Sequence, residues 1–314
     1  MTQLGSSGLD VSTLCLGTNV FGWTADEAAS HAVLDAYVAG GGTFVDTADV
    51  YSAWIDGNSG GESEAIIGSW LAKNPDKRDA LVVATKVSQL APNTGLGRDA
   101  ILGAADASLK RLQTDRIDLY WAHYDDADTP LEETLAAFGE LIAAGKVRAI
   151  GASNYSASRL AEALALSDRE GLPKYVALQP EYNLVAREEY ETHLAPVVAE
   201  HELSTVPYYA LAMGFLTGKY RPGGDAVQSV RARGAAAYLE QPGAVAALEA
   251  LDVVAAAHDT SVAAVALAWL AAQPHVAAPI ASARTVQQLA DLLPVNELVL
   301  SADEVDRLTA ATVA

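Results

Sequence analysis

The segment Gly41-Gly42-Thr43-Phe44-Val45-Asp46-Thr47-Ala48-Asp49-Val50-Tyr51 decides the fold. The short apolar run 43–45 follows a glycine turn, and it predicts a buried strand that ends on the carboxylate of Asp46. A charged group at the end of a buried strand is costly unless it is paired, so a cation must come from elsewhere in the chain. We expect this cation to be Lys86, at the end of the apolar run 81–86.

Two more polar groups belong to the same pattern. A third apolar run, 117–123, ends on His123, and Tyr51 lies on the loop that follows Asp46. Any one of these residues has an ordinary structural explanation, such as a helix cap or a packed ring. Together, three strand ends deliver a carboxylate, an ammonium and an imidazole, with a phenol beside the first.

The whole chain repeats an alternation of strand and helix. Apolar runs predict strands at 13–16, 43–46, 81–86, 117–123, 147–152, 175–179, 204–209 and 276–281. Continuous apolar strands separated by helices favour a parallel sheet that is buried on both faces. We therefore predict an α/β fold: a single (β/α)8 TIM barrel over residues 1–314. It carries an N-terminal hairpin at 4–11, a long loop after the seventh strand and extra C-terminal helices.

A doubly wound sheet is the alternative architecture. Its glycine-rich fingerprint should follow the first strand, but residues 17–22 do not open a helix with the required spacing. The barrel also explains the polar strand ends, because a barrel gathers the carboxyl ends of its strands at one mouth.

Composition limits the function classes. Forty acidic residues against twenty basic ones give a net charge of −20, which argues against binding to nucleic acid or an anionic membrane. No stretch is long and apolar enough to span a membrane, and the first residues do not resemble a signal peptide, so we expect a cytoplasmic protein. The single cysteine, Cys15, excludes an internal disulfide and is expected in the core. The six histidines show no paired ligand spacing, so we expect no metal.

At these positions the chain resembles the aldo-keto reductase family, and the resemblance covers nearly the whole chain. The matching stretches are 46–51, 84–86, 120–123, 151–155, 179–183 and 214–220. The stretch Leu216-Thr217-Gly218-Lys219-Tyr220 is most similar to the bacterial, potassium-channel-β-like branch. The resemblance implies an oxidoreductase that reduces an aldehyde or ketone to the alcohol with NADP(H), reversibly.

The catalytic residues expected from this resemblance are Asp46, Tyr51, Lys86 and His123. Tyr51 is then the acid in reduction and the base in oxidation. A free tyrosine has a pKa of about 10, and we expect the Lys86 ammonium, held in place by Asp46, to lower it. His123 can donate a hydrogen bond to the carbonyl oxygen and orient it.

The resemblance also implies a set of cofactor-binding residues: Ser153, Asn154, Gln179, Tyr208, Leu211, Gly214, Leu216, Gly218, Lys219, Ser282, Arg284 and Gln288. The first three are expected on the nicotinamide carboxamide, although Ser153 or Asn154 could equally cap the next helix. Tyr208 is expected to stack on the nicotinamide ring. Arg284 is expected on the 2′-phosphate, which favours NADP(H) over NAD(H).

The remaining expectations concern the substrate and partners. Trp54 and Tyr124 are expected in the substrate pocket, with packing on the barrel rim as the alternative for Trp54. We expect a small-molecule carbonyl substrate and a monomer or weak homo-oligomer. One alternative function is an NADP(H)-binding regulatory or sensor subunit with little turnover. Another is a barrel isomerase or lyase that uses a phosphate site near the last two strands.

Overall fold

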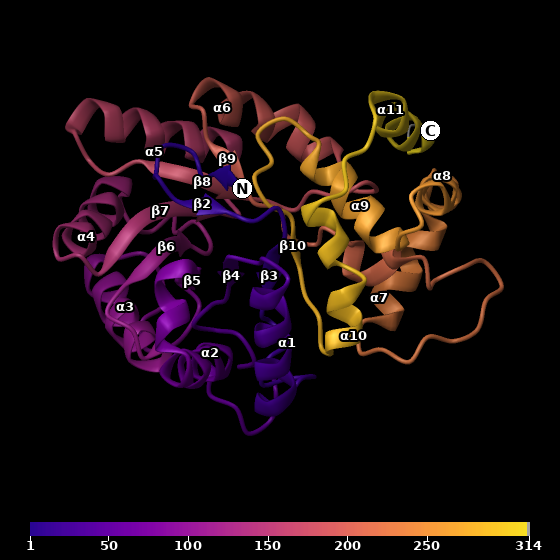
Figure 1. The fold of residues 1–314 in the computed structure, drawn as a ribbon. Helices are drawn as coiled ribbons and strands as arrows, with labels where there is room; N and C mark the ends of the chain where they lie inside the picture. The colour runs from indigo at the N-terminus through magenta and orange to yellow at the C-terminus, as the bar shows by residue number, and fades with distance from the viewer. Residues whose placement is uncertain (313–314) are drawn as a thin grey trace.

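A curved sheet of eight parallel strands forms the centre of the molecule in a computed structural model that describes residues 1–312 (Figure 1). The strands are β3 (Cys15–Gly17), β4 (Phe44–Asp46), β5 (Val82–Val87), β6 (Ile117–Ala122), β7 (Val147–Ser153), β8 (Tyr175–Gln179), β9 (Ser204–Thr205) and β10 (Ile280–Ala281). Their order in the sheet is β10-β3-β4-β5-β6-β7-β8-β9. Strands adjacent in sequence are thus adjacent in space, without the order reversal of a doubly wound sheet.

Backbone hydrogen bonds close the sheet into a barrel. The amide of Ala277 donates to the carbonyl of Thr205 at 2.9 Å, and the amide of Ile280 donates to the carbonyl of Pro207 at 2.9 Å. The two edge strands therefore meet through the segments beside them, and the predicted (β/α)8 barrel is confirmed.

Helices cover the outside of the barrel. Those that follow a strand directly are α1 (Glu27–Ala39), α2 (Glu62–Lys73), α3 (Arg98–Leu112), α4 (Leu131–Ala143), α5 (Ala157–Glu170) and α10 (Val286–Ala290). The 3-10 helix η1 (Pro75–Ala80) leads from α2 into β5. Side-chain caps begin several of the helices: Asp26 accepts a hydrogen bond from the amide of Ala29 at 2.8 Å, and Ser156 accepts one from Arg159 at 3.2 Å.

The predicted N-terminal hairpin is present as β1 (Thr2–Gln3) and β2 (Asp10–Val11), which pair antiparallel. Its apolar side chains, including Leu4 and Leu9, are buried in one cluster with inward-facing barrel residues such as Phe44 and Val82. The same cluster contains Cys15, so the cysteine is a core residue, as predicted.

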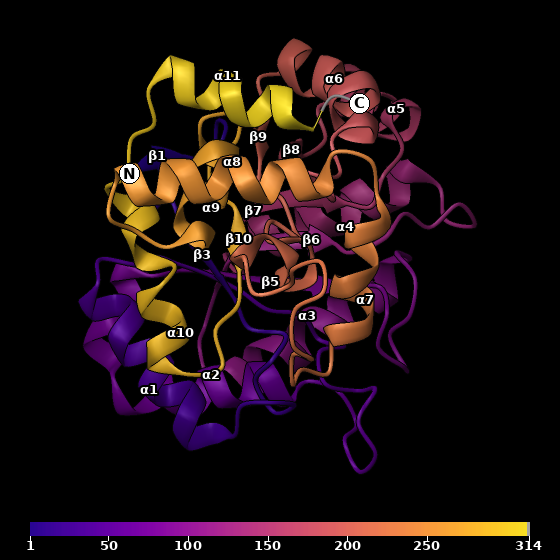
Figure 2. The ribbon, with the colours of Figure 1, turned by 90° about the vertical axis from the view of Figure 1, so that its right-hand side faces the viewer.

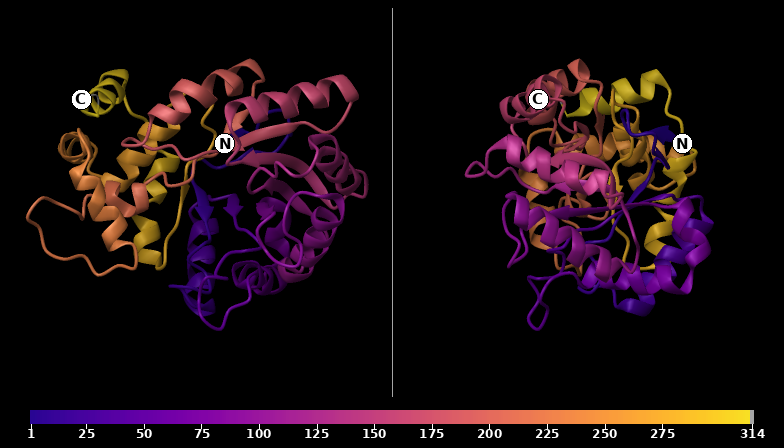
Figure 3. Two further views of the ribbon diagram at one scale, coloured as in Figure 1. Left: turned by 180° about the vertical axis from the view of Figure 1, so that it is seen from behind. Right: turned by 90° about the vertical axis from the view of Figure 1, so that its left-hand side faces the viewer.

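The chain after β9 forms a helical layer on one side of the barrel (Figures 1 and 3). Its elements are η3 (Ala212–Thr217), α7 (Ala232–Ala237), η4 (Tyr238–Glu240), α8 (Ala244–Ala257), α9 (Val262–Ala271), η5 (Leu293–Asn296) and α11 (Ala302–Ala311). Helices α8 and α11 lie side by side (Figure 2). Within residues 1–312 no single helix is long and apolar enough to cross a membrane, although α8 and α9 would qualify as a pair bent by 100°.

Prolines shorten the elements relative to the sequence prediction. The predicted strand 204–209 is reduced to Ser204–Thr205, and the prediction 276–281 is reduced to Ile280–Ala281. Pro207 and Pro279 have no amide hydrogen for a strand ladder.

The predicted helix 188–200 contains the π-helical turn η2 (Tyr190–Leu194) before α6 (Ala195–Glu200). Pro196 cannot donate the α-helical bond to residue 192, so the helix widens there.

Candidate active site

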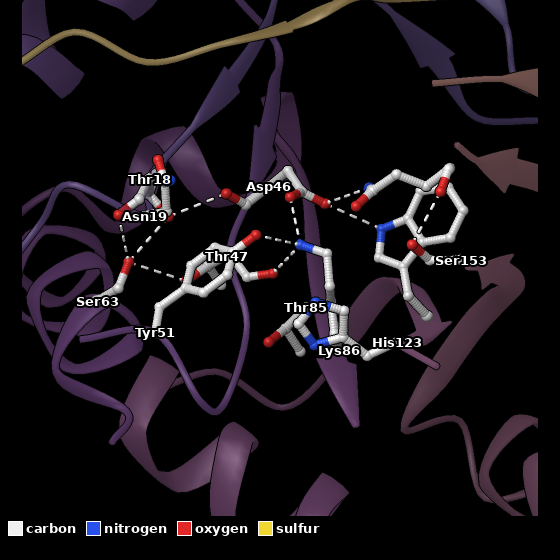
Figure 4. A network of polar contacts seen from close by, with 12 residues as sticks. Thr18, Asn19, Asp46, Thr47, Tyr51, Ser63, Thr85, Lys86, His123 and Ser153 are labelled. Atoms are coloured by element: carbon white, nitrogen blue, oxygen red, sulfur yellow. Dashed lines mark hydrogen bonds and ion pairs between the residues drawn. The ribbon is translucent and has the colours of Figure 1, made fainter. Parts of the chain in front are cut away.

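Three neighbouring strands bring the predicted polar residues to one mouth of the barrel (Figure 4). Asp46 is the last residue of β4, Lys86 lies near the end of β5, and His123 follows β6. Tyr51 returns to the same place from the turn after β4. The carboxyl ends of the strands thus gather all four side chains, as the barrel prediction required.

The ammonium of Lys86 is the centre of the site. It forms an ion pair with Oδ2 of Asp46, donates to the carbonyl of Thr47 at 2.7 Å, and donates to the hydroxyl of Tyr51 at 2.9 Å. An ammonium has three donors, so every proton of this fully buried group has a partner. The expected partner of Asp46 is therefore present.

The second carboxylate oxygen of Asp46 is also held. Oδ1 accepts hydrogen bonds from Nε1 of Trp121 at 3.0 Å and from Nε2 of Gln179 at 3.0 Å. Sequence reasoning missed Trp121. The inward position of Trp121 on β6, in register with Lys86 on β5, is the signal that identifies it. These bonds fix the carboxylate and hence the ammonium beside it.

Burial and charge together set the protonation states. Burial lowers the pKa of Lys86, but the Asp46 carboxylate and Tyr51 raise it by more, so that it lies above its ordinary value and the ammonium stays charged. Burial raises the pKa of Tyr51, and the opposing effect of Lys86 does not cancel it. Lys86 therefore lowers the Tyr51 pKa as predicted, but desolvation outweighs the ammonium, and the net pKa lies above its ordinary value. Tyr51 is a neutral phenol at neutral pH.

His123 is a neutral, buried ring next to Tyr51. Burial, and then the charge of Lys86, hold the pKa of His123 well below its ordinary value. Its ring centroid lies 6.2 Å from that of Tyr51. Among the residues that the structure describes, Nδ1 of His123 has no hydrogen-bond partner. This nitrogen is itself buried, while the ring as a whole lines the cavity described below.

A cavity of about 740 Å³ opens above these side chains. Most of the predicted residues line it: Asp46, Tyr51, Trp54, His123, Tyr124, Ser153, Asn154, Gln179, Tyr208, Leu211, Gly214, Lys219, Ser282, Arg284 and Gln288. Lys86 lies beneath the cavity and reaches it through Tyr51.

Polar side chains at the ends of β7 and β8 form one end of the cavity. Ser153 donates to the carbonyl of Gln179 at 2.8 Å, while Asn154 donates to the carbonyl of His123 at 2.9 Å and accepts from the Tyr208 hydroxyl at 2.9 Å. Helix α5 is capped by Ser156. Neither Ser153 nor Asn154 is the cap, so the capping alternative is excluded.

Cations from two later segments also line the cavity. Lys219 follows η3, and Arg284 precedes α10, where its amide donates to Oε1 of Gln288 at 3.0 Å. Two predicted cofactor-binding residues do not line the cavity. The side chain of Leu216 is buried in the core, and the amide of Gly218 donates to the carbonyl of Phe215 at 3.2 Å as η3 ends in a left-handed turn.

An aromatic wall leads away from Tyr51 along the cavity. The ring centroids of Tyr51 and Trp54 are 6.2 Å apart, and those of Trp54 and Trp23 are 5.6 Å apart. Trp54 thus walls the cavity instead of packing on the barrel rim. The guanidinium of Arg231 lies over Trp23, 5.7 Å from its ring centroid. Sequence reasoning missed Trp23 and Arg231, because both come from loops with no readable pattern.

Comparisons with known proteins agree with this geometry. The sequence model of the aldo/keto reductase family matches residues 13–312. An uncharacterized oxidoreductase, YrpG, of Bacillus subtilis (strain 168) is 34% identical over 307 residues, which cover 95% of this chain and 91% of the relative. Protein tas of Escherichia coli (strain K12) is 35% identical over 96% of this chain and 94% of its own length. A probable voltage-gated potassium channel subunit beta of Oryza sativa subsp. japonica is 32% identical over 98% of this chain and 95% of its own length.

Proposed function

The chain belongs to the aldo/keto reductase family of oxidoreductases, and from this premise we propose that it is an NADPH-dependent enzyme that reduces an aldehyde or ketone to the alcohol. The observation that carries the proposal is the hydrogen bond of 2.9 Å from the buried Lys86 ammonium to the Tyr51 hydroxyl at the floor of the cavity.

In this proposal Tyr51 is the proton donor. A nicotinamide cofactor, when bound, supplies the hydride. The carbonyl oxygen then gains negative charge and needs a proton, which the neutral hydroxyl of Tyr51 carries. Lys86 stabilises the tyrosinate that remains, and it stays charged because Asp46 is paired with it. The neutral imidazole of His123 supports the carbonyl oxygen through a hydrogen bond.

The polar and cationic side chains that line the cavity fit nicotinamide adenine dinucleotide phosphate. We assign the amide and hydroxyl groups of Ser153, Asn154 and Gln179 to the carboxamide. The Tyr208 ring, fixed through its hydroxyl by Asn154, is assigned to the nicotinamide face. Lys219 and Arg284 supply positive charge for the phosphates in a protein whose net charge is −20. We further propose cytoplasmic action on a small-molecule carbonyl, as a monomer or weak homo-oligomer, without nucleic-acid or membrane partners.

A carbonyl panel tests the proposal. Purified protein is mixed with NADPH or NADH and each of a set of aldehydes and ketones, and the loss of reduced-cofactor absorbance is followed. We expect turnover with at least one aldehyde, faster with NADPH. Failure to turn over any carbonyl with either cofactor would contradict the proposed enzyme.

A regulatory or sensor subunit is the second candidate, supported by the similarity to a protein named a probable voltage-gated potassium channel subunit beta. A sensor would bind NADPH tightly and turn over slowly even with its best carbonyl. The presence of a proton donor, a buried cation and a polar cavity in one place favours the enzyme.

A further inference from the structure

We propose that Trp121 is a positioning residue for the proton transfer, because its indole N–H holds Asp46 and thereby the ammonium that touches Tyr51. This inference rests on the proposed function, and it adds a residue that touches neither substrate nor cofactor. Trp121 lies on β6 and is fully buried. Within residues 1–312 it is not among the side chains that line the cavity. It can therefore act on the reaction only through its neighbours.

A continuous chain of polar contacts leads from the indole to the proton donor. Nε1 of Trp121 donates to Oδ1 of Asp46 at 3.0 Å. Oδ2 of the same carboxylate is paired with the ammonium of Lys86, which donates to the hydroxyl of Tyr51 at 2.9 Å (Figure 4). The first three of these side chains are at most 1% exposed. Water does not screen charges at that depth, so a change at the indole is felt at the phenol.

The barrel makes room for this indole by leaving out one side chain. Gly151 on β7 is the register partner of Trp121, and a Cβ atom at Gly151 would lie 2.3 Å from the six-membered ring of the indole. On the other side, Trp121 is the register partner of Lys86 on β5. The absent Cβ lets the ring lie against β7, and in that place its N–H meets the carboxylate of Asp46.

Packing inside the barrel is the competing explanation for Trp121. The residue belongs to the apolar cluster that also contains Phe44 and Leu119. Packing needs the ring alone, whereas a buried indole N–H also needs an acceptor. Here the acceptor is the carboxylate that is paired with the ammonium of the site. Packing therefore predicts a loss of stability alone, and positioning predicts a change in the acidity of Tyr51 as well.

The direction of that change follows from the charges around Tyr51. Burial raises the pKa of Tyr51 most, the Lys86 ammonium lowers it, and the Asp46 carboxylate raises it. An N–H donor on Asp46 stabilises the carboxylate and offsets part of its negative charge. Without this donor the pKa of Tyr51 should rise further, and the tyrosinate left after proton transfer should be less stable.

Three other titratable groups lie around Tyr51. His123 is neutral, as described above. Burial chiefly raises the pKa of the Cys15 thiol well above its ordinary value, so this group is neutral too. Arg231 is a cation whose charge interacts with that of Tyr51. Within the described residues none of the three is hydrogen-bonded to Trp121, so their charges should be the same with and without the indole.

Trp121→Phe is the test variant, since it keeps an aromatic ring and removes the N–H. Complete loss of a hydrogen bond to a charged group is worth roughly ten- to a hundredfold, and only part of it reaches Tyr51 through Lys86. We therefore expect kcat to fall about three- to tenfold. The pH profile of kcat for alcohol oxidation should move to higher pH, while KM for the carbonyl and the NADPH dissociation constant stay unchanged. An unchanged profile would overturn the proposal.

Trp70→Phe is the matched control. Trp70 is a buried residue of α2, and its Nε1 donates to Oδ1 of Asp35 at 2.8 Å. The variant thus removes the same kind of bond outside the cavity lining of the described residues. We expect urea denaturation to show a loss of stability in both variants, and the pH profile to move in Trp121→Phe alone. A profile that moves equally in Trp70→Phe would reduce the effect to a loosened fold and overturn the proposal.

Two measurements keep the test decisive if Trp121→Phe does not fold or if no carbonyl is reduced. Replacement of Trp121 by benzothienylalanine keeps the bicyclic shape and exchanges the N–H for sulfur, and we expect it to shift the profile in the same direction. Ultraviolet difference titration of each protein against its own Tyr51→Phe variant follows the ionisation of Tyr51 without turnover. Ionisation at the same pH with and without the indole N–H would overturn the proposal. A wild type that reduces no carbonyl would instead contradict the proposed function, and this titration would still decide the role of Trp121.

Discussion

The Nζ atom of Lys86 donates a hydrogen bond of 2.9 Å to the hydroxyl of Tyr51. The same ammonium is bonded to Asp46 and to the carbonyl of Thr47, so it cannot move without breaking buried contacts. The proton on Tyr51 is therefore next to a charge whose position is fixed, and the acidity of the phenol depends on that charge.

The first prediction concerns this dependence. We expect Lys86→Met to lose nearly all turnover and Asp46→Asn to lose less. Removal of the ammonium raises the pKa of Tyr51 further, whereas removal of the carboxylate charge only loosens the position of the ammonium. The measurement is the pH profile of kcat for alcohol oxidation. An unchanged profile in Lys86→Met would show that Tyr51 and Lys86 are not linked.

Stability provides the control for this experiment. Lys86→Met leaves Asp46 buried without its cation, which costs about 3–5 kcal/mol of unfolding free energy. The double variant Asp46→Asn/Lys86→Met removes both charges, and we expect it to recover most of the stability without recovering turnover. Chemical denaturation measures the free energy of unfolding of each variant. A variant that is stable but inactive has then lost catalysis and not its fold.

The second prediction concerns Asp49, whose pKa is raised to about 7, first by burial and then by the charge of Glu64. Within the described part of the chain neither of its carboxylate oxygens has a hydrogen-bond partner. Because the folded-state pKa lies above the unfolded value of about 3.9, its stabilising effect is complete below that value and is lost as the pH rises through about 7.

Asp49→Asn should therefore raise the free energy of unfolding by an amount that grows as the pH rises from about 3.9 to about 7, and it should have little effect below a pH of about 3.9. The difference in unfolding free energy between variant and wild type amounts to about 1.4 kcal/mol for each unit by which the pKa of Asp49 is shifted. Urea denaturation of wild type and variant at two pH values gives the difference directly. The same difference at both pH values would mean that Asp49 does not titrate in the folded protein.

The third prediction concerns the choice of cofactor. We expect Arg284→Ala to weaken NADPH binding by roughly ten- to a hundredfold and to leave NADH binding almost unchanged, because we assign its charge-assisted contact to the 2′-phosphate alone. Arg307→Ala is the control, since Arg307 is exposed on α11. Titration by tryptophan fluorescence measures the dissociation constants of both cofactors. Equal losses of affinity for NADPH and NADH would show that Arg284 does not discriminate between them.

The sequence predicted the barrel because eight apolar runs alternate with helical segments, and parallel strands in that pattern must be buried on both faces. It predicted the pairing of Asp46 with Lys86 because a buried carboxylate requires a cation. These inferences depend on short patterns along the chain, and the structure confirms them.

Features that depend on several distant segments escaped prediction. The bond from Trp121 to Asp46 requires the registers of three strands, β4, β5 and β6. The contact of Arg231 with Trp23 joins loops more than 200 positions apart. The lowering effect of Lys86 on the pKa of Tyr51 was predicted but the larger effect of burial was not, because local charge is visible in the sequence whereas depth of burial is a property of the folded molecule.

The most direct test of the account is the turnover of Tyr51→Phe, measured beside its affinity for NADPH. The ring remains and only the hydroxyl is lost, so the cavity and the cofactor contacts should be preserved. General acid catalysis contributes about 10²–10⁴-fold, and we predict a fall of that size in kcat with an unchanged NADPH dissociation constant. Turnover close to that of the wild type would contradict the assignment of Tyr51 as the proton donor.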